Sequence, residues 1–384
     1  MRILHTSDWH VGKTLKGHSR SPDQIAALAA VVKVATEHRP DLVIVAGDLY
    51  ESASPTADAT RIVTRALSAL RATGASVVAI GGNHDNGAAL DALRPWADAA
   101  GIALRGTPRS AEDLILTGTT AAGEPWRLAA LPFVSRRYAI RATEMFELSA
   151  AEATQTHADH IGRLLARLAE SFVWDGRTVN LVAAHLTVVG ARVGGGEREA
   201  QTILDYAVPA TVFPAGTHYV ALGHLHRAQP VSGPGPIRYS GCPLAVDFGE
   251  SDLATSVSIV DVTAETAARV TEVPVTAGRP LRTVRGTVAE LSGHDPGDAL
   301  LRVFVAEPPR AGLREEVQEL LPQALEVRID PALLPNAPAS TTGSSSRAGR
   351  GPGALFADYL AQAGHADEAT LALFHQLHDE IRHP

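Results

Sequence analysis

Short apolar runs rich in β-branched residues recur in the first part of the chain, and two helix-like stretches separate them. The runs are Ile3–Leu4, Leu42–Ala46 and Val77–Ile80, and the helical stretches cover residues 22–38 and 56–73. Alternation of strand and helix is typical of a parallel sheet whose crossover helices cover its face. The sequence therefore predicts an α/β fold with buried, mostly parallel strands in this part of the chain.

Proline and glycine mark the ends of both predicted helices. Pro22 follows Ser21, and Pro55 follows Ser54. Because serine is a favoured helix N-cap and proline is favoured at the first helical position, we expect both serines to be N-caps. We expect Gly74 to end the second helix, since glycine readily adopts the left-handed conformation found at helix C-termini.

Further strand-like runs extend this α/β unit as far as residue 277. They are Trp126–Leu131, Thr178–Ala184, Tyr219–Leu222, Arg238–Ser240 and Ser256–Val262. The pattern then changes to a strand from Leu281, a strand at Leu300–Val305, a helix at Leu313–Leu325 and a strand at Glu326–Ile329. We expect residues 1–277 to form one large domain and residues 278–335 to form a small α+β domain.

The C-terminal region combines a low-complexity stretch with two apolar stripes. Residues 336–353 are rich in Gly, Ser and Pro, a composition typical of a flexible linker. Residues 354–384 carry apolar residues at helical spacing in two groups, which are Leu355, Phe356, Tyr359 and Leu360, and Leu371, Phe374, Leu377 and Ile381. Two short amphipathic helices on a linker either bind a groove of a partner protein or fold back on their own domain, and the pattern favours neither.

Composition and charge exclude several classes of protein. The 384 residues are 45% hydrophobic and 20% charged, which is typical of globular rather than disordered or membrane proteins. The formal net charge of -8 argues against binding of nucleic acid by bulk electrostatic attraction. Cys242 is the only cysteine, and we find no signal peptide and no apolar stretch long enough to span a bilayer, so we expect a reducing, cytoplasmic compartment.

Aspartate, histidine and asparagine directly follow five of the predicted strands. These residues are Asp8 and His10, Asp48, the run Asn83, His84 and Asp85, His185, and the pair His224 and His226. In an open α/β sheet, groups just beyond the carboxyl ends of strands converge on one crevice. Each residue alone is more simply explained as a turn or capping residue, but five strand ends that carry the same residue types predict a shared site.

A binuclear metal centre is the chemistry that suits these residue types. Carboxylate, imidazole and amide ligands without a thiolate favour Mn²⁺, Fe or Zn²⁺ over softer metals, and one carboxylate can bridge two ions. Two ions about 3.5 to 4 Å apart activate water at neutral pH and stabilise an in-line displacement at phosphorus. The single cysteine excludes a cysteine-based zinc site.

Five short motifs around these residues resemble those of the calcineurin-like metallophosphoesterases, in the same order along the chain. The motifs are Thr6–Gly12, Gly47–Tyr50, Gly82–Asp85, Ala184–His185 and Gly223–His226. Within that superfamily, Ala221–Gln229 and Tyr239–Leu244 are similar to the nuclease subunits of bacterial complexes that act on DNA double-strand breaks. The resemblance spans most of residues 1–250 and returns in the tail. It implies a β-sandwich flanked by helices (αββα), with a small α+β capping domain and a C-terminal helical tail.

The resemblance also implies a role for each residue at the strand ends. One metal ion is expected to bind Asp8, His10, Asp48 and His226, and the other to bind Asp48 as the bridge, Asn83, His185 and His224. His84 is expected to be a catalytic histidine rather than a ligand, with Asp85 orienting its imidazole ring. Glu51 is left unassigned, because some relatives carry His or Asp at this position. The segment Arg192–Arg198 is either a loop that contacts the DNA backbone or an ordinary solvated turn.

Three functions are compatible with these motifs. The first is a Mn²⁺-dependent DNA exonuclease and endonuclease for double-strand ends and hairpins in recombination, replication and repair. It implies an ATPase partner bound by the C-terminal helices, and a homodimer within a heterotetramer. The second is a phosphatase or small-molecule phosphodiesterase, and the third is a scaffold subunit that brings DNA ends together. The small domain and the tail favour the nuclease, and the net charge does not exclude it, because two divalent ions add about four positive charges to the pocket.

Overall fold

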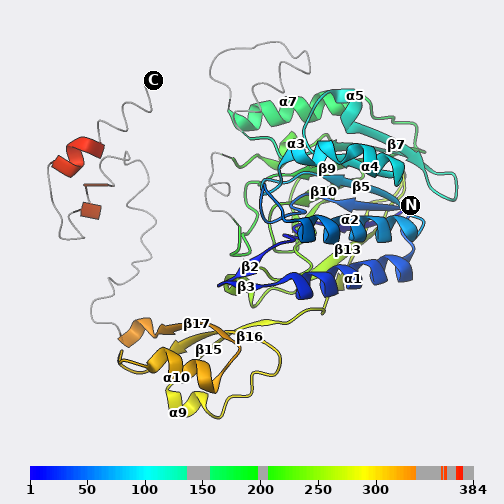
Figure 1. The fold of residues 1–384 in the computed structure, drawn as a ribbon. Helices are drawn as coiled ribbons and strands as arrows, with labels where there is room; N and C mark the ends of the chain where they lie inside the picture. The colour runs from blue at the N-terminus through cyan, green and yellow to red at the C-terminus, as the bar shows by residue number, and fades with distance from the viewer. Residues whose placement is uncertain (136–155, 198–205, 334–355, 358, 361–368, 375–384) are drawn as a thin grey trace. The chain divides into compact units, whose positions relative to one another are not determined.

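The computed structural model describes residues 1–135, 156–197 and 206–333, together with residues 356–357, 359–360 and 369–374 of the C-terminal region (Figure 1). The predicted linker of residues 336–353 lies outside the described residues. Residues 1–305 and 310–328 belong to one compact unit, and the described residues among 306–309 and 329–384 belong to a second.

The first sheet has six strands in the order β14-β13-β1-β4-β5-β6. Their bounds are Arg269–Pro274 (β14), Ser256–Asp261 (β13), Arg2–Thr6 (β1), Leu42–Val45 (β4), Ser76–Ile80 (β5) and Ile102–Arg105 (β6). β1, β4, β5 and β6 run parallel, while β13 pairs antiparallel with both β1 and β14. The parallel arrangement predicted for the first three strands is confirmed.

The second sheet also has six strands, in the order β11-β12-β10-β9-β8-β7. Their bounds are Gln229–Val231 (β11), Ile237–Tyr239 (β12), Tyr219–Gly223 (β10), Val179–His185 (β9), Pro125–Leu131 (β8) and Ile115–Thr119 (β7). The four central strands run parallel, and the two edge strands pair antiparallel with their neighbours. β9 and β10, which lead into three of the predicted ligands, are therefore central strands.

The two sheets pack face to face, and alternation along each strand divides the side chains between two layers. In β4, Ile44 belongs to the buried cluster between the sheets, whereas Val43 belongs to the cluster beneath the helices. In β9, Leu181 faces the other sheet and Val182 faces the outer cluster. Because successive side chains of a strand point to opposite faces and both faces are covered, β4 is apolar at every position and β9 is apolar at all but Asn180 and His185.

Helices cover the outer face of each sheet and complete the αββα arrangement (Figure 1). α1 (Ser21–His38) and α2 (Ala57–Ala72) lie side by side on the first sheet, where α3 (Gly87–Ala92) and α4 (Arg94–Ala99) join the same apolar cluster. α7 (His157–Ala169) packs on the second sheet, beside the short helix α5 (Ala111–Leu114). Among the described residues, we find no helix with both the length and the apolar character needed to cross a bilayer.

The N-caps of the first two helices differ from those predicted. α1 begins at Ser21, and its N-cap is Arg20, so the serine is already helical. α2 begins at Ala57, and its N-cap is Thr56 rather than Ser54. The proline motif located both helix starts only to within one or two residues, because proline is tolerated throughout the first turn and just before it. Gly74 ends α2 as predicted, with a φ of 98°.

The small α+β module has the predicted order of strands and one additional helix. Strands β15 (Leu281–Gly286), β16 (Leu300–Val305) and β17 (Ala324–Ile329) form a sheet in that order. Helix α9 (Val288–Leu291) is additional, and α10 (Leu313–Leu320) ends before the predicted Leu325. Pro322 explains this shorter helix, because proline lacks the N–H that a further helical turn requires.

A hairpin after the first strand and a turn after the second sheet contact this module. The hairpin consists of β2 (Thr14–Leu15) and β3 (His18–Ser19), and the turn is the 3-10 helix η2 (Phe248–Glu250). Leu15 and Phe248 form a buried cluster with Leu281 and Leu300 of the module. The guanidinium of Arg302 in β16 lies 4.8 Å from the centre of the Phe248 ring.

The described residues of the C-terminal region are helical, and their apolar side chains contact one another. The rings of Phe356 and Phe374, one from each predicted stripe, stack with their centres 4.3 Å apart. Leu360 is buried. Leu355, Leu377 and Ile381 lie outside the described residues.

Candidate metal centre

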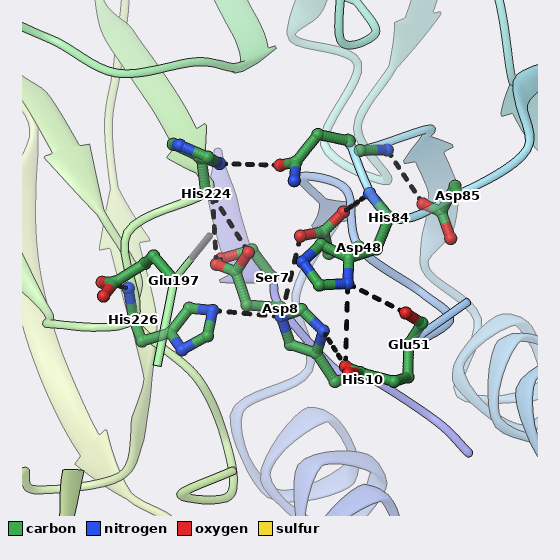
Figure 2. A network of polar contacts seen from close by, with 12 residues as sticks. Ser7, Asp8, His10, Asp48, Glu51, His84, Asp85, Glu197, His224 and His226 are labelled. Atoms are coloured by element: carbon green, nitrogen blue, oxygen red, sulfur yellow. Dashed lines mark hydrogen bonds and ion pairs between the residues drawn. The ribbon is translucent and has the colours of Figure 1, made fainter. Parts of the chain in front are cut away.

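Loops at the carboxyl ends of five strands converge on one buried site (Figure 2). β1 leads into Asp8 and His10, β4 into Asp48, β5 into Asn83, His84 and Asp85, β9 ends at His185, and β10 leads into His224 and His226. Donor atoms of Asp8, His10 and His226 lie within 4.8 Å of one another, and so do donor atoms of Asp8, Asp48 and His185. The structure therefore brings every predicted ligand to the same place.

Four of these residues have backbone conformations that side chains other than glycine rarely adopt. The φ angles are 56° at Asp8, 46° at His10, 52° at Asp48 and 100° at His224. Such strain costs about 1–3 kcal/mol per residue and is typical of functional sites. Hydrogen bonds between the loops hold it in place, since Asp8 N donates to Gly47 O and His10 N donates to Asp48 O, each at 3.0 Å.

Glycines next to the ligands allow the loops to approach one another closely. A Cβ atom on Gly82 would lie 2.1 Å from Oδ1 of Asp48, and one on Gly223 would lie 1.9 Å from the carbonyl oxygen of Ala46. Both contacts are too short for any side chain. The motifs Gly82–Asn83 and Gly223–His224 therefore combine a ligand with the space that its loop requires.

The first group of donors is centred on two histidine rings. Nε2 of His10 lies 3.0 Å from Nε2 of His226, and Nδ1 of His10 lies 3.0 Å from a carboxylate oxygen of Glu51. Nδ1 of His226 is hydrogen-bonded to the carboxylate of Glu250. Because a carboxylate only accepts hydrogen bonds, both Nδ1 atoms carry a proton and donate it to the carboxylates. The two Nε2 atoms face each other, and each has a lone pair that can bind a cation.

A proton or a metal ion must lie at these facing nitrogens. Burial lowers the pKa of His226, but Glu250 and Asp8 raise it to about 9 overall. His226 therefore carries a proton when no metal is bound, and a divalent ion displaces that proton when it binds. Since a metal-binding histidine usually donates its second ring nitrogen to a carboxylate, this group fits a metal site.

The second group of donors surrounds the amide oxygen of Asn83. This oxygen lies 2.8 Å from Nε2 of His185 and 2.7 Å from Nδ1 of His224. The other ring nitrogen of His185 donates to the carbonyl of Ala46 at 2.8 Å, which fixes the orientation of the ring. Nε2 of His185 is also 3.5 Å from Oδ2 of Asp48.

Asp48 lies between the two groups of donors. Its Oδ2 is 3.6 Å from Nε2 of His10 in the first group and 3.5 Å from Nε2 of His185 in the second. Burial raises the pKa of Asp48, but the rings of His185, His10 and His84 hold it well below its usual range. An ionised carboxylate at this position suits a bridge between two cations.

The donor chemistry fits oxygen- and nitrogen-binding divalent metals. The ligand set consists of carboxylates, imidazoles and one amide, which is the set that Mn²⁺, Fe and Zn²⁺ accept. Cys242 lies near His226 and Glu250. Burial raises the pKa of its thiol well above the usual value, so the sulfur stays protonated and is a poor ligand.

His84 lies beside the first group of donors and is hydrogen-bonded to Asp48 and to the backbone of Glu51. Its backbone N–H donates to Oδ1 of Asp48 at 2.8 Å, and its Nδ1 lies 2.9 Å from the backbone oxygen of Glu51. The ring meets that of His10 edge to face, with centres 4.6 Å apart. Burial lowers the pKa of His84 to about 4.

Asp85 does not contact the ring of His84 as predicted. Within the part of the chain that the structure describes, its carboxylate instead accepts hydrogen bonds from the N–H groups of Leu49, Tyr50 and Gly82 at 2.8–3.1 Å. Figure 2 shows Asp85 turned away from the imidazole. The carbonyl of Glu51 orients the ring, and Asp85 ties the loop of His84 to the loop of Asp48.

Three glutamates in the site were not assigned from the sequence. Glu250 in η2 is fully buried and binds His226, while Glu197 accepts a hydrogen bond from the backbone N–H of His226 at 3.0 Å. Glu51 contacts His10 and forms an ion pair with Lys13 at 2.9 Å. Burial raises the pKa of Glu51, but its bonds to His10 and Lys13 lower it to about 2 overall, so this carboxylate is ionised.

Comparisons with known proteins give a matching family and several similar proteins. The family model described as calcineurin-like phosphoesterase matches residues 1–228. Three similar curated proteins are each named as the SbcD component of the nuclease SbcCD. The Bacillus subtilis protein is 36% identical over 285 residues, which cover 73% of this chain and 71% of the relative. The Rhodobacter capsulatus protein is 34% identical over 283 residues, which cover 70% of this chain and 68% of the relative. The Escherichia coli K12 protein is 29% identical over 304 residues, which cover 77% of this chain and 73% of the relative.

Proposed function

Since this chain belongs to the calcineurin-like phosphoesterase family and is related to the SbcD components of SbcCD nucleases, we propose that it is a metal-dependent DNA nuclease. It hydrolyses phosphodiester bonds at double-stranded DNA ends and hairpins, as exonuclease and endonuclease, in recombination, replication and repair. The observation that carries this proposal is the convergence of two groups of metal donors on the shared carboxylate of Asp48.

Each strand-end residue has a role in this proposal. One ion would be held by Asp8, His10, Asp48 and His226, and a second would be held by Asp48, Asn83, His185 and His224. Mn²⁺ is the ion we propose for both places. Such a pair of ions, when bound, stabilises charge on the phosphoryl oxygens and makes water a better nucleophile at neutral pH.

His84 is the catalytic residue that contacts the phosphoryl group. Its Nδ1 donates to the carbonyl of Glu51, so Nε2 is the atom left to face the phosphoryl group. Nε2 stabilises the transition state or protonates the leaving oxygen once the ring has taken up a second proton, which the negative charge of a bound phosphate favours. Asp85 is a positioning residue, because its three backbone hydrogen bonds fix the loop that carries His84.

The remaining segments serve partners and substrate in this proposal. Residues 1–277 form the nuclease domain, residues 278–335 form a capping domain, and residues 336–353 are a linker to a helical tail at residues 354–384. The tail binds an SbcC-like ATPase, and two copies of the chain form a homodimer within a heterotetramer. The name of the relatives, which describes one part of a larger nuclease, supports the presence of a partner subunit. A cytoplasmic location is supported by the single, free cysteine.

A cleavage assay on the full-length chain tests the function. Labelled linear duplex DNA is incubated with Mn²⁺ or with a chelator, with and without the ATPase partner. We expect digestion only with Mn²⁺, and a loss of at least about 100-fold in Asp48→Asn. Asp298→Asn is the matched control, because Asp298 is an exposed aspartate of the small module. DNA that stays intact while p-nitrophenyl phosphate is hydrolysed would instead identify a phosphatase.

A further inference from the structure

The turn η2 contacts both the metal centre and the small module of strands β15, β16 and β17. On one side, the carboxylate of Glu250 in η2 is hydrogen-bonded to Nδ1 of His226. On the other side, Phe248 in the same turn is buried against Leu281 and Leu300 of the module. A single three-residue turn therefore holds a predicted metal ligand with one side chain and the module with another.

The carboxylate of Glu250 is fixed by the backbone around it. The side chain is fully buried, and one carboxylate oxygen contacts His226 while the other accepts a hydrogen bond from the N–H of Val246 at 2.7 Å. A Cβ atom on Gly196 would lie 2.2 Å from the oxygen that contacts His226, so the backbone of that residue closes on the carboxylate as well. The position of this carboxylate behind His226 therefore depends on the position of η2.

Arg302 in β16 connects the small module to η2 through a cation. Its guanidinium lies 4.8 Å from the centre of the Phe248 ring, and its Nη2 lies 3.7 Å from Oδ1 of Asp247. The same Oδ1 accepts a hydrogen bond from the N–H of Gly249 at 2.9 Å and thereby caps η2. Because the side chain of Arg302 is only 20% exposed, its attraction to the ring and to the carboxylate is less screened than that of a surface pair.

The guanidinium of Arg302 is itself held by the module. Its Nε donates to Oε2 of Glu326 in β17 at 2.7 Å, and Arg328 of the same strand pairs with the other oxygen of Glu326. The contacts thus run without a gap from β17 through Arg302 and η2 to His226.

We propose that Arg302 is a positioning residue of the metal centre, and that the small module controls through η2 how tightly the first group of donors binds its ion. When the module holds η2, Glu250 stays behind His226 and strengthens its Nε2 as a ligand. When this contact is lost, the turn shifts and the ion at His10 and His226 binds more weakly. This inference rests on the proposed metal-dependent nuclease and adds to it a control of metal loading.

The effect should be confined to one of the two ions. In the second group of donors, the ring of His185 is oriented by the carbonyl of Ala46, which directly follows β4. That carbonyl is held by the first sheet rather than by η2. A weaker first ion beside an unchanged second ion is therefore the specific sign of control through η2.

Two substitutions of arginine in the full-length protein separate this control from general support of the fold. Arg302→Met keeps a long apolar side chain and removes the charge over Phe248. Arg328→Met is the matched control, because Arg328 pairs with the same Glu326 from β17. Arg302→Lys keeps a cation over the ring and is expected to bind Mn²⁺ within about twofold of wild type.

Calorimetric titration with Mn²⁺ and hydrogen exchange without metal are the two measurements. In Arg302→Met, we expect one of the two binding steps to weaken at least about fivefold and the other to change less than about twofold. Amide exchange at residues 246–250 should become at least about fivefold faster, because η2 opens more often. In Arg328→Met, both quantities should stay within about twofold of wild type.

DNA cleavage gives a third value that separates metal loading from catalysis. Arg302→Met should need about five times more Mn²⁺ for half of its maximal rate, and its maximal rate should stay within about twofold of wild type. A lower maximal rate at every Mn²⁺ concentration, with unchanged metal affinity, would contradict the control of metal loading.

The other outcomes decide between the control by the module and the nuclease itself. Equal Mn²⁺ affinity in wild type and Arg302→Met contradicts the control, and Mn²⁺-dependent cleavage by wild type then leaves the nuclease standing. Wild type that cuts no DNA contradicts the nuclease, while a selective loss of Mn²⁺ affinity in Arg302→Met still supports the control. If Arg328→Met loses as much affinity, if both binding steps weaken together, or if Arg302→Lys restores nothing, Arg302 only supports the fold. A loss of affinity with unchanged exchange at residues 246–250 also overturns the proposal, because the effect would not pass through η2.

Discussion

Nε2 of His10 and Nε2 of His226 face each other at 3.0 Å, although 216 residues separate them in the chain. Glu51 holds the other nitrogen of the first ring and Glu250 holds that of the second. Two carboxylates behind two imidazoles make both facing nitrogens strong donors. This arrangement favours a cation between the strand-end loops.

Divalent metal should therefore raise the thermal stability of the protein. An ion at 100 times its dissociation constant adds about 2.7 kcal/mol per site, provided that it binds only the folded state. Calorimetric melting with Mn²⁺ and with a chelator measures the change. The double variant Asp8→Asn and His226→Ala should lose about half of the rise in Tm, because the second site keeps all of its own ligands, and an unchanged rise in that variant would show that the metal binds elsewhere.

Replacing Glu250 should weaken metal binding without removing a ligand. Glu250→Gln keeps the size of the side chain but removes the charge that strengthens His226 as a donor. The loss of such a partner costs about 10- to 100-fold in metal affinity. Titration calorimetry with Mn²⁺ measures it, and Glu265→Gln at an exposed position is the control. Equal affinities in the two variants would contradict a role for Glu250.

Removing the ring of His84 should affect catalysis and spare metal binding. His84→Ala is expected to lower kcat about 10²- to 10⁴-fold, as for the loss of a general acid or base. Mn²⁺ affinity should stay within about threefold of wild type. Rates on bis-p-nitrophenyl phosphate and calorimetric titration give the two values. A large loss of affinity would identify His84 as a ligand, which its distance to Asp48 and His10 also allows.

The space at Gly82 should be essential to the centre. In Gly82→Ala, the added methyl group would lie 2.1 Å from Oδ1 and 2.3 Å from the backbone nitrogen of Asp48. Because a backbone atom blocks the methyl group, the loop must move. We expect the unfolding free energy to fall by about 1–3 kcal/mol and the metal-dependent activity to be lost. Urea unfolding measures the first quantity. Gly293→Ala, where the nearest atom is 3.8 Å away, should change neither value.

The strand-end residues could be predicted because each is marked by its own neighbours in the sequence. Asp48 follows the apolar run of β4 and His185 ends that of β9, so the parallel sheets bring them together once the strands are recognised. Glycine beside Asn83 and His224 added a second local signal, which the close approach of the loops explains.

The supporting contacts could not be predicted, because they depend on distant parts of the chain. Glu250 belongs to a short turn with no pattern of its own, and only the fold places it behind His226. The predicted bond between Asp85 and His84 was wrong for a related reason. A backbone carbonyl, that of Glu51, orients the ring, and every residue has a carbonyl, so the sequence contains no signal for it.

Anomalous diffraction from a crystal grown with Mn²⁺ tests the central claim most directly. We predict two peaks that share Asp48, one between His10 and His226 with Asp8, and the other among Asn83, His185 and His224. A single peak, or two peaks of which neither contacts Asp48, would contradict the binuclear centre on which the proposed nuclease rests.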